Sequence, residues 1–190
     1  NDGRFDLNSD MHVQDFLNNC FDVKVLKDLT IIDTSPVLKI NGSFSSRKSG
    51  GFLVTANGHG NINKFSFLET DFDKLSSDFS WKDGDLYLRD LEIIREGDHL
   101  SGNIMRQGDQ VRFDLMSSLP LKALKRFIKA EGPPEEALSH VTFSENSTIA
   151  LDVSGTIYLG DRTDWSATGT VLLNDLTYKG TRLHHLATSY

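Results

Sequence analysis

Residues 85–115 read DLYLRDLEIIREGDHLSGNIMRQGDQVRFDL, and this stretch has the clearest strand pattern in the chain. Apolar and polar residues alternate over segments of five to seven residues, which is the period of a half-buried strand. Glu96-Gly97-Asp98 and Gln107-Gly108-Asp109-Gln110 interrupt the alternation with residues that favour tight hairpin turns. The pattern therefore predicts an antiparallel meander. Residues 45–51 and Asn57-Gly58-His59-Gly60 predict two further turns.

The meander is predicted to have one apolar and one polar face, because successive side chains of a strand point to opposite sides. Such a sheet must bury its apolar face against a helix, a second sheet, its own curl or a ligand. We therefore expect the apolar face to form a core or to contact lipid. It is expected to carry Leu86, Leu88, Leu100, Ile104, Val111, Phe113 and Leu115.

The sequence of the last strand in this stretch occurs earlier in the chain. Arg4-Phe5-Asp6-Leu7 returns as Arg112-Phe113-Asp114-Leu115, and three further segments return in the same order, at offsets between 108 and 113 residues. Four ordered matches at so constant an offset predict an internal repeat, with a first unit at residues 1–110 and a second, truncated unit at residues 111–190. The later pairs are residues 29–31 with 141–143, 38–44 with 151–157, and 72–79 with 183–190.

Two segments depart from the strand pattern. Residues 10–20 and 118–130 carry apolar residues at helical spacing. Ser9 or Asp10 can cap the first helix, and Pro120 suits the first turn of the second. The predicted fold is therefore mainly β with short helices. It is an antiparallel, curled repeat sheet, made of two copies of a β-meander plus a short helix in one continuous architecture.

The composition is that of a folded, acidic chain. Of the 190 residues, 38% are hydrophobic and 25% are charged, and the formal net charge is −7. Nucleic-acid binding requires clustered Lys and Arg, and the one dense cluster, within residues 122–129, has the spacing of a solvated helix face. We therefore expect no nucleic-acid partner. Cys20 is the single cysteine, so no internal disulfide or thiolate metal site is expected.

Several of these segments resemble the C-terminal region of AsmA-like proteins, a family related to TamB and to the bridge-like lipid-transfer proteins. The resemblance rests on Leu100-Ser101-Gly102-Asn103-Ile104, on residues 111–115 ahead of a Ser-linked short helix, and on residues 151–157 and 169–180. It extends over nearly the whole chain as a succession of strands with Gly and Asp turns, and it includes no catalytic motif.

The resemblance implies a long, curled sheet whose concave apolar face holds lipid acyl chains. It implies a non-enzymatic protein of a Gram-negative cell, anchored in the inner membrane and reaching into the periplasm. Such a protein takes part in lipid or phospholipid binding or transport and in maintenance of the outer envelope. The expected partners are acyl chains or further repeats of the full-length protein. We expect the membrane anchor to lie outside residues 1–190, and we expect no cofactor.

An aspartic-type acid peptidase is the alternative function. Residues 31–35, Ile-Ile-Asp-Thr-Ser, match the signature of these enzymes, and Asp152 can be read as belonging to a second half-signature. Aspartic peptidases use two carboxylates that share one proton. In the repeat register, however, Asp33 aligns with Glu145. Asp152 aligns with Lys39, so the two aspartates are not equivalent positions. The segment around Asp33 also has the Ser and Pro that favour a turn.

Metal and nucleotide chemistry are not predicted. His184 and His185 are adjacent, and adjacent side chains of a strand face opposite sides, so these two cannot bind one metal together. The other histidines are scattered, and the sequence contains no phosphate-loop or dinucleotide motif. A second alternative function is a β-rich protein-interaction module that binds partners through its sheet edges.

Overall fold

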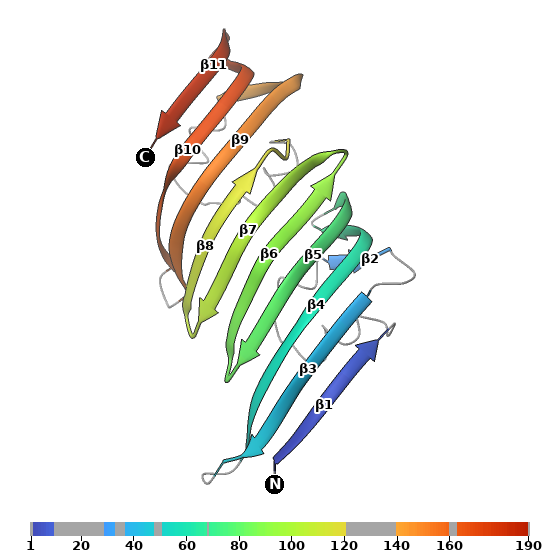
Figure 1. Ribbon diagram of the computed structural model, residues 1–190. Helices are drawn as coiled ribbons and strands as arrows, with labels where there is room; N and C mark the ends of the chain where they lie inside the picture. The colour runs from blue at the N-terminus through green and yellow to red at the C-terminus, as the bar shows by residue number, and fades with distance from the viewer. Residues whose placement is uncertain are drawn as a thin grey trace.

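The protein is an all-β structure in the residues that the computed structural model describes, which are 2–9, 29–32, 37–47, 51–67, 69–120, 140–159 and 163–189. Within these ranges eleven strands form a single antiparallel sheet that does not close on itself (Figure 1). The prediction of a mainly β fold with a curled antiparallel sheet is confirmed. The strands are β1 (Asp2–Ser9), β2 (Leu29–Ile31), β3 (Val37–Ser46), β4 (Phe52–Phe67), β5 (Thr70–Lys82), β6 (Asp85–Arg95), β7 (Asp98–Gln107), β8 (Gln110–Ser117), β9 (Val141–Leu159), β10 (Thr163–Tyr178) and β11 (Thr181–Ser189).

The sheet follows the order of the chain, from β1 through β3 to β11, and β2 pairs with β4 beside this path. β1 and β11 are therefore the two edges (Figure 1). The helix predicted at residues 10–20 lies outside the described residues, and so does the second predicted helix except for residues 118–120, which form neither helix nor strand.

Two-residue hairpin turns connect the central strands, as predicted. Glu96 and Gly97 both have positive φ, at 52° and 91°, which is the geometry of the type I′ turn that matches the twist of paired strands. Gly108 alone is positive, at 55°, in the β7–β8 turn, as in a type II′ turn. At the loop predicted for residues 45–51, β3 continues to Ser46 and pairs with β4 from Phe52, and the Arg47 N–H donates to the Gly51 carbonyl at 3.0 Å; residues 48–50 lie outside the described residues.

The turn predicted at residues 57–60 is wrong, because these residues lie in the interior of β4. The reason is a cross-strand contact between glycine and phenylalanine. A Cβ placed on Gly58 would lie 2.5 Å from the ring of Phe79, so the ring occupies the space of the missing side chain. Aromatic rings that cover glycines in this way stabilise strands that glycine alone would weaken. The same arrangement joins Phe5 with Gly42 and Phe113 with Gly155.

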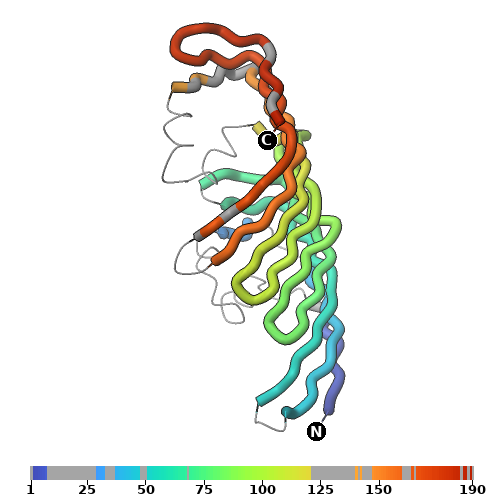
Figure 2. The backbone as a smooth tube through the Cα atoms, turned by 90° about the vertical axis from the view of Figure 1, so that its left-hand side faces the viewer, coloured from blue at the N-terminus to red at the C-terminus, as the bar shows by residue number. Residues whose placement is uncertain are grey.

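The strands are long and curved. The pairing register shifts between Leu88 and Leu91 in β6 and between Asn174 and Leu176 in β10. Asp90 and Asp175, the residues inside these shifts, have φ of 49° and 52°. Bulges of this kind bend a strand and increase its twist. Figure 2 shows the sheet turned by 90°, with β9 and β10 bending strongly along their length.

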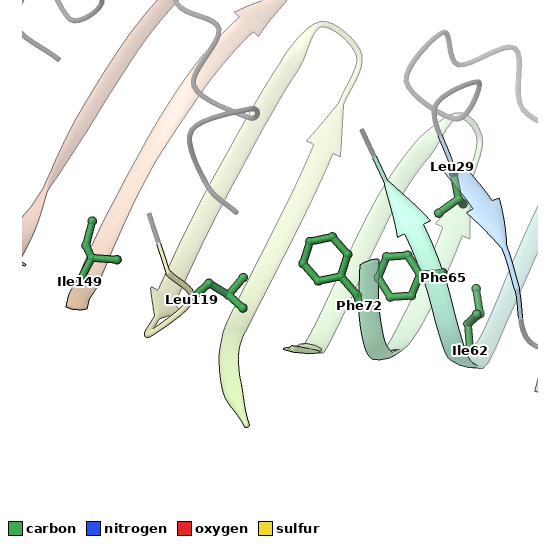
Figure 3. Packing of buried hydrophobic residues seen from close by; sticks show 6 residues of the cluster. All are labelled: Leu29, Ile62, Phe65, Phe72, Leu119 and Ile149. Carbon is green, nitrogen blue, oxygen red and sulfur yellow. The ribbon is translucent and has the colours of Figure 1, made fainter. Parts of the chain in front are cut away.

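The buried core lies on one side of the sheet, towards one end of the strands. Phe65 and Phe72 stack with ring centroids 5.0 Å apart, and both are less than 5% exposed. Leu119, which follows β8, is 1% exposed and belongs to the same cluster (Figure 3). The buried members of the cluster are Leu29, Ile62, Phe65, Phe72, Leu119 and Ile149.

The two glycines of β4 provide a direct test of the ring contact. We expect Gly58→Ala to lower the free energy of unfolding by about 1–3 kcal/mol, because the new methyl group must displace the Phe79 ring or the Lys39 carbonyl, 2.2 Å away. Gly60→Ala is the matched control, since its nearest neighbour would lie 3.8 Å away. Gly60→Ala should be neutral or stabilising by up to about 1 kcal/mol. Urea unfolding of both variants measures the difference, and equal effects would contradict the proposed role of the ring.

Candidate binding face

The strand register places all seven predicted apolar-face residues on one face of the sheet. Leu88, Ile104 and Phe113 are direct neighbours across β6, β7 and β8. Leu86 and Val111 lie in the adjacent row, on either side of Arg106. All seven are half-buried. This face of the sheet, formed by these residues and their cross-strand neighbours, is called the apolar face below.

The central row of the apolar face continues far beyond the predicted residues. Each member is the direct cross-strand partner of the next, over nine strands from β1 to β10. With neighbouring strands about 4.8 Å apart, the row is on the order of 38 Å long. None of its residues is charged. The row runs Leu7, Ile40, Gly58, Phe79, Leu88, Ile104, Phe113, Gly155, Ala167.

Exposure of the apolar face changes along the strands. At the end where β3–β4, β5–β6 and β7–β8 turn, here called the open end, Phe52 is 62% exposed and Leu159 is 45% exposed. Phe44 contacts Phe52 edge-to-face there, at 5.9 Å between ring centroids. At the opposite end, here called the closed end, Phe65 and Leu176 are 3% and 2% exposed. The face is thus packed at the closed end and accessible at the open end.

The opposite face of the sheet is polar and ionic. Lys39, His59, Asp78 and Arg89 form one row across four strands. The His59 Nδ1 lies 2.7 Å from the Asp78 Oδ1. Exposed pairs of this kind contribute little to stability, at most about 1 kcal/mol. Their main effect is that this part of the face, on β3 to β6, remains hydrated.

Lys74 and Glu92 form an ion pair on the polar face, and this pair shifts the pKa of Glu92. The Lys74 ammonium donates to Glu92 Oε2 at 2.6 Å. This hydrogen bond and the charge of Lys74 lower the pKa of Glu92, and the Ser76 hydroxyl contributes a weaker hydrogen bond. Because the folded-state pKa is lowered, the pair stabilises the fold at neutral pH, and the effect is lost as the pH falls through that pKa.

The peptidase hypothesis needs Asp33 and Asp152 side by side, and the described residues do not test it. Asp33 lies outside them. Asp152 is exposed on the polar face of β9, between Met116 and Thr170 of the neighbouring strands. It borders a shallow hollow of about 480 Å³, in which it is the one titratable lining residue. The hollow is lined by Ala150, Leu151, Asp152, Thr170, Val171, Leu172, Ala187 and Ser189.

The described ranges contain no group of three His, Cys, Asp or Glu side chains that would hold a metal ion. The nearest approach to such a cluster is at β10 and β11, where His184 Nδ1 lies 3.3 Å and an Arg182 nitrogen 3.4 Å from Asp175 Oδ1. One carboxylate shared by a guanidinium and an imidazole forms an exposed ion-pair group, which is not a set of metal ligands. In the same ranges, no helix is long and apolar enough to cross a membrane.

Sequence reasoning missed the part of the apolar face that lies on β1, β3, β4 and β5. Leu7, Ile40 and Phe79 alternate with polar residues in the sequence, and this alternation was a usable signal. The glycines between them concealed it, because a glycine is read as a turn until its cross-strand neighbour is known. The exposed aromatic residues Phe44 and Phe52 were missed for a related reason, since they flank the polar loop at residues 47–51.

Comparisons of the chain with protein-family models, curated proteins and solved structures returned no match. The relationship to AsmA-like proteins therefore stays a prediction from the sequence.

The Lys74–Glu92 pair yields a pH-dependent prediction. We expect Lys74→Met to raise the pKa of Glu92, because the variant loses both the hydrogen bond and the nearby positive charge. NMR titration of the Glu92 side-chain carboxyl measures the pKa directly. Lys39→Met, on the same face but beside His59, should leave the pKa of Glu92 unchanged. An unchanged pKa in Lys74→Met would show that the pair does not form in solution.

Proposed function

We propose that this chain binds lipid acyl chains on its apolar face and acts without catalysis of its own. The observation that carries the proposal is the uncharged row from Leu7 to Ala167, which crosses nine strands and remains half-buried over its centre. A contiguous apolar surface of this length rarely stays in contact with water, and such surfaces mark binding sites.

The chemistry of the row favours a hydrocarbon chain as the ligand. The row consists of Leu, Ile, Phe, Ala and Gly, so it offers apolar contact and no side-chain hydrogen bond. A ligand held in this way must itself be apolar and elongated, because a polar ligand would lose its hydrogen bonds to water. The exposed Phe52 and Leu159 at the open end give such a chain a place to enter.

The cellular role in this proposal rests on the sequence resemblance to AsmA-like proteins. We propose a periplasmic segment of a Gram-negative protein that is anchored in the inner membrane outside residues 1–190. Its role is phospholipid binding or transport and maintenance of the outer envelope. The partners are lipid acyl chains and further repeats of the full-length protein.

A brominated acyl chain tests the proposal, because bromine quenches tryptophan fluorescence on contact. Trp81 lies on the apolar face, between Ala56 and Leu86. In a Trp165→Phe background, dibromostearate at micromolar concentration should quench Trp81 in a saturable manner. Saturable quenching that unbrominated stearate reverses supports the proposal, whereas an absence of quenching together with an absence of displaceable fluorescent fatty acid contradicts it.

Charge substitutions on adjacent residues of β6 distinguish the two faces. Leu88→Glu places a carboxylate in the central row and should weaken acyl binding at least tenfold, or about 1.4 kcal/mol. Arg89→Glu is the matched control, because Arg89 is exposed on the polar face one residue away. Its affinity should stay within about twofold of the unsubstituted chain. Both variants are first checked for native circular dichroism, and equal losses in the two would show that the ligand does not use the apolar face.

A further inference from the structure

The two predicted repeat units pair their strands in the same register. In each unit, a phenylalanine of the first strand lies across from a glycine of the second, and that glycine lies across from an alanine of the third. The rows are Phe5–Gly42–Ala56 in the first unit and Phe113–Gly155–Ala167 in the second.

A second, independent part of the register also coincides. Leu29–Ile31 pairs with residues 65–67 of β4, and residues 141–143 pair in the same order with residues 176–178 of β10. Each of these pairings begins directly after a residue of positive φ, Lys64 at 57° in β4 and Asp175 at 52° in β10. Residues other than glycine rarely adopt a positive φ. Their coincidence at corresponding positions supports the interpretation that β1, β4 and β5 correspond to β8, β10 and β11, and that β2 and β3 together correspond to β9.

The correspondence makes β1 equivalent to a strand from the interior of the sheet. β8 pairs with β7 on one side and with β9 on the other. β1 pairs with β3 on the side that corresponds to β9, and none of the described strands pairs with its other side. Both strands contain the sequence Arg-Phe-Asp-Leu with the same exposure pattern, in which Arg and Asp are exposed and Phe and Leu are half-buried.

β1 carries the charged residues Asp2, Arg4 and Asp6 on the polar face, but it lacks other features that protect natural sheet edges. Such edges carry proline, a bulge or a charge pointing to the buried face. β1 contains no proline and pairs with β3 over eight consecutive residues without a register shift. The residues of β1 on the apolar face are Gly3, Phe5 and Leu7, and none is charged. Within the described strands, the outer edge of β1 is therefore unpaired and has no bulge or proline that would block strand addition.

We infer that the outer edge of β1 is a docking site for one antiparallel strand with the chemistry of β7. The occupant places a branched apolar residue across from Phe5, as Ile104 lies across from Phe113. It places glycine or another small residue across from Leu7, as Gly102 lies across from Leu115. Uncharged residues face Arg4 and Asp6 on the polar side. The added strand widens the apolar face by one strand. Its docking does not require that the apolar face bind lipid.

A synthetic peptide with the β7 sequence, residues 98–107, tests the site through register-specific disulfide formation. The full chain carries Cys20→Ser, to remove the native thiol, together with Asp6→Cys. The peptide carries a cysteine at position 103, the residue that lies across from Asp114 in the native pairing and therefore from Asp6 in the proposed one. Asp6 is exposed, so its substitution should leave the fold intact.

We expect cross-linking to peptide position 103 to be at least tenfold faster than to a peptide with its cysteine at position 101 or 105. A chain with His184→Cys, on the opposite edge, is the matched control and should cross-link at the slow rate. Amide hydrogen exchange in β1 should also slow when the cysteine-free peptide is added. The inference is overturned by equal rates at the three peptide positions, by faster cross-linking at His184→Cys, or by β1 exchange that the peptide leaves unchanged. Homodimers of the Asp6→Cys chain that the peptide does not compete away would also overturn it.

Discussion

A sheet of a single layer has two faces, and the sequence provides a continuous apolar row for one of them. A sandwich buries such a face against a second sheet, and that solution is not present among the described strands. The apolar face is instead packed at the closed end, around Phe65, Phe72 and Leu119, and left half-buried elsewhere. The Phe–Gly pairs belong to the same solution, because a ring that lies over a glycine backbone covers both its own area and the peptide beneath it. The ionic pairs of the other face are consistent with the same constraint, since no described strand packs on that face.

Much of this fold follows from local sequence. The strands and turns between residues 85 and 115 could be predicted because each is specified by neighbours within a few positions: alternation sets the strand, and Glu96-Gly97 or Gly108-Asp109 sets the turn. Gly58 could not be placed in the same way. Its role is decided by Phe79, which follows it by more than twenty residues, and the local signal of two glycines near an asparagine favours a turn.

The candidate binding face could also be predicted only where local sequence specifies it. The seven residues from Leu86 to Leu115 belong to consecutive hairpins, so their common face follows from the period of two alone. The extension through Ile40 to Leu7 required the β1–β3 pairing, which joins strands separated by more than twenty residues of sequence. The internal echo of Arg-Phe-Asp-Leu held the missing information, because it relates β1 to a strand whose neighbours are fixed by tight turns. The predicted repeat thus extends a local pattern to a distant part of the chain.

The main path of the described sheet has an even number of strands, and this has a geometric consequence. With ten strands alternating in direction, the two edge strands β1 and β11 are antiparallel to each other. Adding one hairpin at either end restores the same two directions and lengthens the ribbon by about 10 Å. The two dimensions of the sheet are therefore independent. Its dimension along the strands is set by strand length and bulges, and its dimension across the strands is set by the number of hairpins. A sheet of this kind can therefore be lengthened by whole hairpins without a change in its cross-section.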